Sequence, residues 1–209
     1  MSKIGLLPEE VQATLFQRLG VEKEQDLKFL GRGSFADTYW LPDKTKVFKI
    51  TRDKTDAITS AYLIGKKPQY IIRTYEVFQL SPHLYGIINE KLLPLSGSQT
   101  KKWKELVDIY HNMILYGERV PKLSQSRLTV KWVTQFKEIV WATLDDLADQ
   151  LENEFDALLL FASELEHYHI QWSDLQAGNI LNRGHTSVIS DLGGNSSSPG
   201  GASRIEQLS

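Results

Sequence analysis

Three polar side chains near the end of the sequence have the types and the spacing to carry chemistry. Asn179 follows Asp174 by five residues, and Asp191 follows Asn179 by twelve. One carboxylate can orient or deprotonate an attacking hydroxyl, while a second carboxylate and an amide can ligate Mg²⁺ beside nucleotide phosphates. We therefore interpret Asp174 as a catalytic residue and Asn179 and Asp191 as metal ligands. An Asx-rich turn between two strands is the alternative, because Asp, Asn and Gly also recur in turns for backbone reasons.

A glycine-rich stretch near the N-terminus has the composition to hold the phosphates. A short strand predicted over 27–30 runs into Gly31-Arg32-Gly33-Ser34-Phe35-Ala36, and a second strand follows. Glycine has no side chain to block the approach of a phosphate to backbone N–H groups. A hairpin that uses its glycines only for turn geometry has the same pattern, so both interpretations remain open at this point.

Together these features resemble the protein-kinase-like superfamily, which also contains small-molecule kinases of the aminoglycoside-phosphotransferase type. The resemblance covers about residues 27–194 and implies ATP and Mg²⁺ as cofactors. It assigns nucleotide contacts to the glycine-rich loop, with Ala36 at the third glycine position, and to the backbone of a hinge near Glu90 to Leu92. The residues so assigned are Gly31, Gly33, Ser34, Ala36, Lys49, Glu90 and Leu92.

Lys49 is the second catalytic residue that the resemblance implies. It follows the glycine-rich loop at about the distance of the lysine that holds nucleotide phosphates in this superfamily, although a lysine on a half-exposed strand is often only a surface residue. The partner of that lysine is normally a glutamate on the next helix. The helix predicted over 53–64 contains no glutamate, and Asp56 is its only interior acid. Either Asp56 or no residue of this helix pairs with Lys49.

Other departures from the protein-kinase pattern surround the catalytic loop. Trp172-Ser173-Asp174 stands where protein kinases have His-Arg-Asp, Gln176 replaces a lysine, and Leu192 replaces the phenylalanine of Asp-Phe-Gly. The missing lysine normally helps to neutralise the transferred phosphoryl group. Only sixteen residues follow Gly193, so we expect a minimal, atypical kinase without an activation segment or a distal C-lobe.

Hydrophobic periodicity predicts the elements that position these residues. Helical spacing or strand alternation predicts helices over 8–19, 53–64, 103–116, 131–141 and 143–168, and strands over 27–30, 46–51, 71–78, 84–90 and 187–190. The predicted fold is α+β and protein-kinase-like, with two lobes. An N-lobe with an antiparallel sheet covers 1–90, a reduced helical C-lobe covers 91–195, and a flexible tail covers 196–209.

Composition limits the partners and the location. The 209 residues are 41% hydrophobic and 24% charged, with a formal net charge of −2 and no cysteine. Disulfides and thiolate chemistry are thereby excluded, and no apolar run reaches membrane-spanning length. We expect a cytoplasmic protein with no membrane or clear nucleic-acid partner. A chain that ends so soon after Gly193 is expected to cover an apolar face by homodimerisation or by binding a protein.

Three functional hypotheses follow. The leading one is an atypical ATP-dependent kinase that phosphorylates Ser or Thr of proteins, including its own serine-rich tail around Ser196 to Ser203. The alternative is a pseudokinase that binds nucleotide or a partner protein without catalysis, as the lack of a helix glutamate and Gln176 suggest. The third is a small-molecule kinase, which would need no activation loop.

Overall fold

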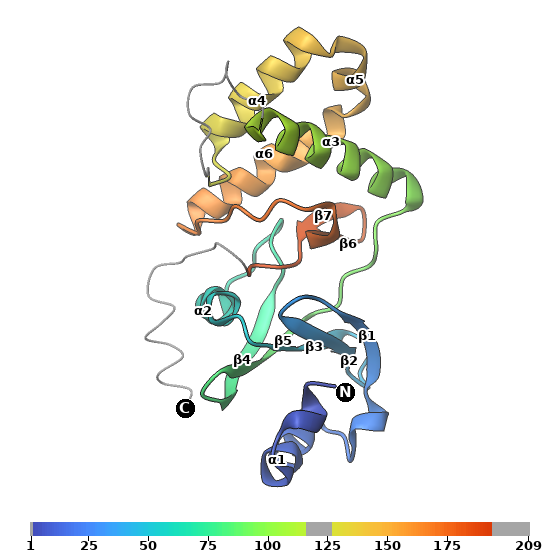
Figure 1. Ribbon diagram of the computed structural model, residues 1–209, viewed down its shortest axis with the longest axis vertical. Coiled ribbons are helices and arrows are strands. Elements are labelled where there is room, and N and C mark those ends of the chain that lie inside the picture. The colour runs from blue at the N-terminus through green and yellow to red at the C-terminus, as the bar shows by residue number, and fades with distance from the viewer. Residues whose placement is uncertain (1, 116–126, 194–209) are drawn as a thin grey trace. The chain divides into compact units, whose positions relative to one another are not determined.

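The computed structural model describes residues 2–115 and 127–193, which divide into two compact units (Figure 1). Within the described residues, the first unit holds 2–67 and 73–91, and the second holds 68–72 and 92–193. The tail expected at 196–209, with its candidate sites of self-phosphorylation, lies outside the described residues. None of the described helices is both long enough and apolar enough to cross a membrane.

The first unit is a five-stranded antiparallel sheet in the order β1-β2-β3-β5-β4, with one helix on each face (Figure 1). Its strands are β1 (Lys28–Arg32), β2 (Ala36–Trp40), β3 (Lys46–Thr51), β4 (Thr74–Ser81) and β5 (Leu84–Glu90). Its helices are α1 (Glu9–Leu19) and α2 (Lys54–Leu63), with short 3-10 turns η1 (Ile4–Leu6) and η2 (Glu24–Asp26). In this arrangement α2 connects β3 to β4.

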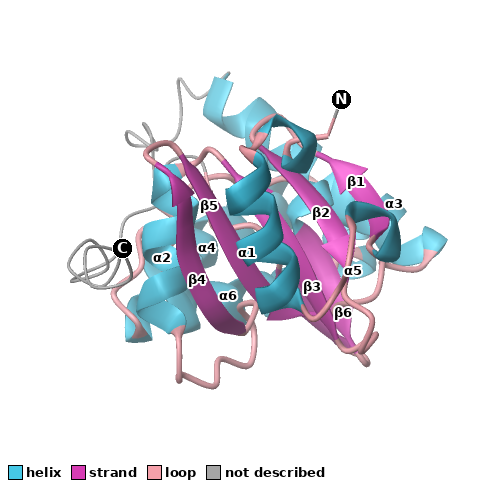
Figure 2. Ribbon diagram, turned by 90° about the horizontal axis from the view of Figure 1, so that it is seen from below, coloured by secondary structure: helices cyan, strands magenta, loops and turns pink. Residues whose placement is uncertain are grey.

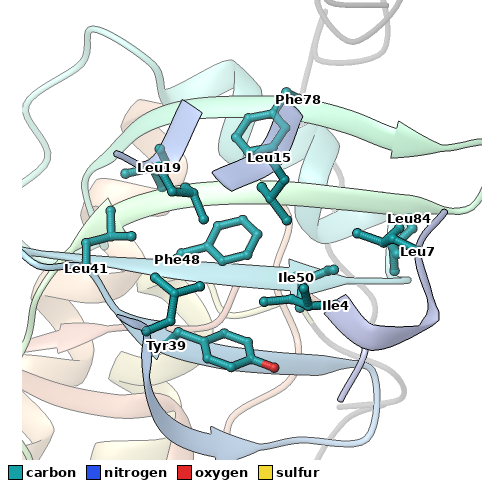
Figure 3. Packing of buried hydrophobic residues seen from close by; sticks show 12 residues of the cluster. Ile4, Leu7, Leu15, Leu19, Tyr39, Leu41, Phe48, Ile50, Phe78 and Leu84 are labelled. Carbon is teal, nitrogen blue, oxygen red and sulfur yellow. The ribbon is translucent and has the colours of Figure 1, made fainter. Parts of the chain in front are cut away.

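Strand alternation sorts the side chains of β3 onto the two faces of the sheet. Phe48 and Ile50 pack with Leu15 and Leu19 of α1 in one core cluster (Figure 3), while Lys49 projects from the opposite face. Figure 2 shows α1 lying across the strands, a position that the sequence left undetermined. The α2 face has its own smaller cluster, made of Ala57, Ala61, Val77, Tyr85 and Ile87.

Gly86 in β5 allows aromatic rings to stack over the sheet. Phe48 stacks on Tyr39 and on Phe78, with ring centroids 6.3 and 6.2 Å apart. A Cβ atom added at Gly86 would lie 2.4 Å from Cε2 of Phe78 and 3.0 Å from Cε2 of Phe48. Glycine is therefore required here by packing and not by backbone conformation.

The second unit contains four helices and a two-stranded hairpin within the described residues. The helices are α3 (Gly97–Leu115), α4 (Val130–Thr143), α5 (Asp145–Gln150) and α6 (Glu152–His167), and the hairpin is β6 (Ile180–Arg183) with β7 (Thr186–Ile189). A 3-10 turn, η3 (Ala177–Asn179), precedes β6. The core is aromatic: Trp103 stacks on Phe161 with centroids 5.6 Å apart, and Phe136 contacts Trp132 and Phe155.

Two predicted elements are wrong in their extent. The continuous helix expected at 143–168 is broken at Leu151, whose φ of −104° and ψ of 8° leave the helical range, and α5 and α6 each contact α4. Leu144, which lies within the expected helix, is outside both α5 and α6 and is 43% exposed. The strand expected at 71–78 begins only at Thr74.

Residues 68–72 belong to the second unit because polar side chains there hold their backbone. Ile71 forms a parallel bridge with Ile189, and the guanidinium of Arg183 donates to the carbonyls of Pro68, Gln69 and Ile71. The carboxylate of Glu164 accepts the N–H groups of Gln69 and Tyr70, each at 2.6 Å. These contacts use backbone groups that a strand would have paired with β5.

Gly86→Ala is expected to lower the free energy of unfolding by about 1–3 kcal/mol, because the new methyl group must displace the ring of Phe78. Gly97→Ala is the control, since a Cβ atom there meets nothing within 4 Å. Urea unfolding of both variants measures the difference. Equal stability of the two variants would contradict the packing role of Gly86.

Candidate active site

In the first unit, a buried ion pair joins the predicted catalytic lysine to α2. The Nζ atom of Lys49 lies 2.8 Å from Oδ2 of Asp56, and the two side chains are only 11% and 4% exposed. Asp53 caps the helix, since its Oδ1 accepts the N–H groups of Thr55 and Asp56 at 2.8 and 3.3 Å. The cap fixes the first turn of α2, where Asp56 reaches Lys49 despite being one methylene shorter than glutamate. The partner that the sequence left open is therefore Asp56.

The glycine-rich loop between β1 and β2 has backbone ties and open space beside its glycines. The N–H of Gly33 donates to the carbonyl of Ala36 at 2.8 Å, and the N–H of Arg52 donates to the carbonyl of Phe35 at 3.0 Å. A Cβ atom added at Gly31 would meet nothing within 4 Å, and one added at Gly33 would first meet the Ala36 oxygen at 3.9 Å. Neither glycine has a positive φ. Neither turn conformation nor packing therefore requires glycine at these two positions, and both leave open space beside the backbone.

Asp37, a buried carboxylate beside this loop, was not predicted from the sequence. Asp37 in β2 has no exposed surface, and it accepts hydrogen bonds from Nε and Nη2 of Arg32 at 2.8 and 3.0 Å. It also accepts the backbone N–H and the ammonium of Lys3 at 3.1 and 3.2 Å. Burial alone would raise the pKa of Asp37, but the hydrogen bonds from Arg32 and Lys3 outweigh burial and lower the pKa to about 2. The sequence did contain a sign of this site, because aspartate is rare inside strands and is buried there only when it has hydrogen-bond or ion-pair partners.

The predicted hinge residues lie at the boundary between the two units. The N–H of Glu90 donates to the carbonyl of Arg73 at 3.0 Å, and Oε1 of Glu90 accepts the N–H of Arg73 at 2.7 Å. The N–H of Lys91 donates to the carbonyl of Thr45. The side chain of Glu90 is therefore occupied in the first unit. Leu92, the first hinge residue of the second unit, is 9% exposed.

In the second unit, two amides orient the carboxylate of Asp174. Nδ2 of Asn179 donates to Oδ2 and to the backbone carbonyl of Asp174 at 3.1 and 3.0 Å, and Nε2 of Gln176 donates to Oδ1 at 2.8 Å. The turn η3 supports this arrangement through a hydrogen bond from the N–H of Asn179 to the carbonyl of Gln176. With Nδ2 directed to Asp174, the Oδ1 atom of Asn179 is left as the oxygen for a metal ion.

Backbone hydrogen bonds bring the segment of Asp191 to that of Asn179. The N–H and the hydroxyl of Ser190 donate to the carbonyl of Asn179 at 2.8 and 3.0 Å. The indole N–H of the fully buried Trp172 donates to the carbonyl of Asp191 at 3.1 Å, and Oδ1 of Asp191 accepts the N–H of Gly193 at 2.9 Å. The three residues predicted from the sequence thus lie in one hydrogen-bonded assembly. Trp172 serves there as a structural donor.

The donor set fits Mg²⁺ carried by a nucleotide. One carboxylate, from Asp191, and one amide oxygen, from Asn179, match the sparse protein ligation that Mg²⁺ accepts when phosphates and water complete its octahedron. No cluster of three or more His, Cys, Asp or Glu side chains suited to a metal occurs in residues 2–115 and 127–193.

Comparisons with known proteins give only low-scoring likenesses to solved structures. No protein-family model matches the chain, and no curated protein sequence matches it. Among solved structures, the aminoglycoside phosphotransferase APH(4)-Ia is similar with a TM-score of 0.41 and 15% identity, over 87% of this chain and 70% of that one. The kinase PK-1 of Cydia pomonella Granulovirus gives a TM-score of 0.41 and 14% identity, over 92% and 61%. APH(3'')-Id from Streptomyces rimosus gives 0.36 and 12%, over 92% and 76%.

The arrangement of the elements defines the class more directly than these low scores. The antiparallel sheet with α2 inserted between β3 and β4, followed by helices and the β6–β7 hairpin, is an α+β, protein-kinase-like fold. The fold class predicted from the sequence is therefore confirmed. Within it, Lys49 pairs with an aspartate, and Asp174, Asn179 and Asp191 share one loop assembly.

Lys49→Met is expected to lower the free energy of unfolding by about 3 kcal/mol, because it leaves the carboxylate of Asp56 buried without its cation. Lys46→Met is the matched control on the same strand. Its side chain is 41% exposed and lies 3.7 Å from Asp43, so its removal should cost less than about 1 kcal/mol. Urea unfolding measures the stability of both variants. An equal decrease in their free energies of unfolding would show that the Lys49–Asp56 pair does not stabilise the fold.

The low pKa of Asp37 predicts a pH-dependent part of the stability. Its pKa in the folded chain, about 2, lies below the ordinary value of 3.8, so the unfolded chain binds the proton more readily. The ionised carboxylate stabilises the folded state above about pH 4, and this contribution disappears as the pH falls through about 2. The difference in unfolding free energy between the wild type and Asp37→Asn should therefore shrink over this range. A difference independent of pH would show that the charge of Asp37 contributes nothing.

Proposed function

We propose that the chain is an ATP-dependent phosphotransferase with an atypical kinase site. The observation that carries the proposal is the Asp174 assembly, in which Asn179 and Gln176 hold one carboxylate in a fixed orientation beside the segment of Asp191. An aspartate in an Asx turn needs only its own backbone, whereas this one receives two side-chain amides and still has exposed surface. Such pre-organisation is what an acceptor-orienting base requires.

Each remaining residue has a role that its surroundings support. Asp56 keeps the ammonium of Lys49 in place on β3, where Lys49 would hold nucleotide phosphates. The N–H groups around Gly31 and Gly33 would cover those phosphates, and Asn179 and Asp191 would hold Mg²⁺. The ion, when bound, neutralises charge on the phosphate oxygens. The backbone near Glu90 to Leu92 would contact the base.

In the proposed reaction, Asp174 orients the acceptor hydroxyl and takes its proton. The hydroxyl oxygen bonds to the γ-phosphorus, the bond from that phosphorus to the bridging oxygen breaks, and ADP leaves with the bridging electrons. We propose Ser or Thr of a protein as the acceptor. The carboxylate suits an aliphatic hydroxyl of either a protein or a small molecule, so both acceptor classes belong in the test.

The second candidate function is nucleotide binding without catalysis, and Gln176 motivates it. Its amide occupies Oδ1 of Asp174 at 2.8 Å, so an acceptor hydroxyl must share or displace that hydrogen bond. Gln176 also brings no positive charge to the transferred phosphoryl group, where protein kinases supply a lysine. A pseudokinase would retain the pocket for nucleotide while losing this chemistry.

The first experiment incubates the purified chain with γ-labelled ATP and Mg²⁺, alone, with a mixture of protein substrates, and with small-molecule alcohols. Asp174→Asn should reduce phosphoryl transfer at least about a hundredfold, as expected for loss of a general base. Asp149→Asn on α5 is the control, because Asp149 is exposed and the substitution has the same chemistry. Calorimetric titration with Mg-ATP runs in parallel, with Lys49→Met as the binding-deficient variant.

Label transfer that Asp174→Asn abolishes and Asp149→Asn preserves would establish the kinase, and the labelled acceptor would identify its class. Mg-ATP binding that Lys49→Met weakens, without label from any variant, would establish the pseudokinase. Equal labelling by wild type and Asp174→Asn would reject the assigned role of Asp174. Absence of both binding and transfer would reject both candidate functions.

A further inference from the structure

Asp37 connects the glycine-rich loop to the beginning of the chain. Arg32, between the two loop glycines, donates one hydrogen bond to each oxygen of its carboxylate, and Lys3 does the same. The three residues come from β1, β2 and the segment before η1, so one buried carboxylate joins three parts of the first unit. A carboxylate without exposed surface depends on these donors, because burial without them is strongly unfavourable.

The segment that carries Lys3 is packed onto the sheet. We call residues 2–7 the N-terminal strap. Ile4 is completely buried and Leu7 is 7% exposed, and both belong to the core cluster that contains Tyr39, Ile50 and Leu84 (Figure 3). The strap therefore has an apolar attachment to the sheet and a polar attachment to Asp37. Its position determines whether Lys3 reaches the carboxylate.

The glycine-rich loop has little packing of its own to hold it. Gly31 and Gly33 contribute no side chains, and Phe35 at the tip is 60% exposed. The backbone ties of Gly33 to Ala36 and of Arg52 to Phe35 close the turn at its tip. The ion pair of Arg32 with Asp37 anchors the other side of the loop, where β1 ends. On this side, the pairing of β1 with β2 shifts register between Phe29 and Gly31. A register shift leaves that side of the loop with fewer ladder hydrogen bonds.

We propose that Asp37 is a positioning residue for the phosphate-binding loop, and that the N-terminal strap controls, through Lys3 and Asp37, how tightly the loop holds a nucleotide. The inference rests on the proposed nucleotide-binding role of the loop. With the strap in place, Lys3 shares the buried charge and Asp37 remains a rigid acceptor for Arg32. When the strap leaves the sheet, the carboxylate loses two of its donors and the anchor of the loop weakens. A protein that binds the strap would thereby lower nucleotide affinity without touching the site.

The test uses the full chain with three substitutions. Lys3→Met removes the ammonium but keeps the backbone donor, Asp37→Asn removes the charge with little change of shape, and Lys3→Arg keeps a cation. Arg18→Met is the control, because it breaks an exposed ion pair with Glu76 in the same unit, away from the loop. The probes are Mg²⁺ with a non-hydrolysable ATP analogue, followed by calorimetry, and amide hydrogen exchange of residues 31–36 in the absence of nucleotide.

We expect Lys3→Met and Asp37→Asn to raise the dissociation constant about fivefold or more, a coupling at the lower end for linked sites. Both should speed amide exchange in residues 31–36 while exchange in α2 stays unchanged. Lys3→Arg should retain near wild-type binding, and Arg18→Met should change neither quantity. A merely structural role would instead speed exchange across the whole unit and lower its stability.

Wild-type affinity and wild-type loop exchange in both Lys3→Met and Asp37→Asn would overturn the inference. Failure of the proposed function gives a different result, because the wild type itself would then bind no ATP analogue. In that case local acceleration of exchange at 31–36 would still support the mechanical link from the strap to the loop. Unchanged exchange would reject that link as well.

Discussion

A carboxylate that is buried away from water must be paired with a cation or with several N–H donors. The first unit contains two such buried carboxylates, those of Asp56 and Asp37. Asp56 meets this requirement through Lys49, so charge joins strand β3 to helix α2, while the apolar cluster on the same face joins α2 to β4 and β5. Asp37 meets it through Arg32 and Lys3, so the glycine-rich loop and the beginning of the chain share one buried charge. In both cases a residue proposed to act on phosphate is adjacent to, or part of, a buried ion pair. The same pairing that permits burial also fixes where the cation lies.

The second unit solves a related problem with neutral donors. Asp174 is oriented by the amides of Asn179 and Gln176, and the backbone of Asp191 is held by the indole of Trp172. Neutral amides orient a carboxylate without adding charge beside it. In the proposed reaction, no cation among the described residues would compete for the base, and the transferred phosphoryl group would lack the lysine that protein kinases place there. The same hydrogen bond thus favours pre-organisation and limits the electrostatic help available for chemistry.

At three positions where the chain departs from the protein-kinase pattern, the substituted side chain has a hydrogen-bond or ion-pair partner in the structure. Asp56 replaces a glutamate because the cap made by Asp53 places the first turn of α2 beside Lys49. Trp172 replaces a histidine and supplies an indole donor from the core to the backbone of Asp191. Gln176 replaces a lysine and donates a hydrogen bond to the carboxylate of Asp174. Each of these side chains thus has a hydrogen-bond or ion-pair partner within its own unit.

The sequence by itself determined most of the strands and helices along the chain and the spacing of Asp174, Asn179 and Asp191, because periodicity and turn chemistry act over neighbouring residues. It also indicated the glycine-rich loop and the strand that carries Lys49. Tertiary structure alone decided that Asp56 pairs with Lys49, that α1 covers the sheet, and that Arg183 and Glu164 hold residues 68–72 in the second unit. Tertiary structure also determined that the helix breaks at Leu151 and that Lys3 and Arg32 both bind the carboxylate of Asp37. These features depend on contacts between residues that are distant in sequence or on which face a helix must bury, and neither leaves a local pattern in the chain.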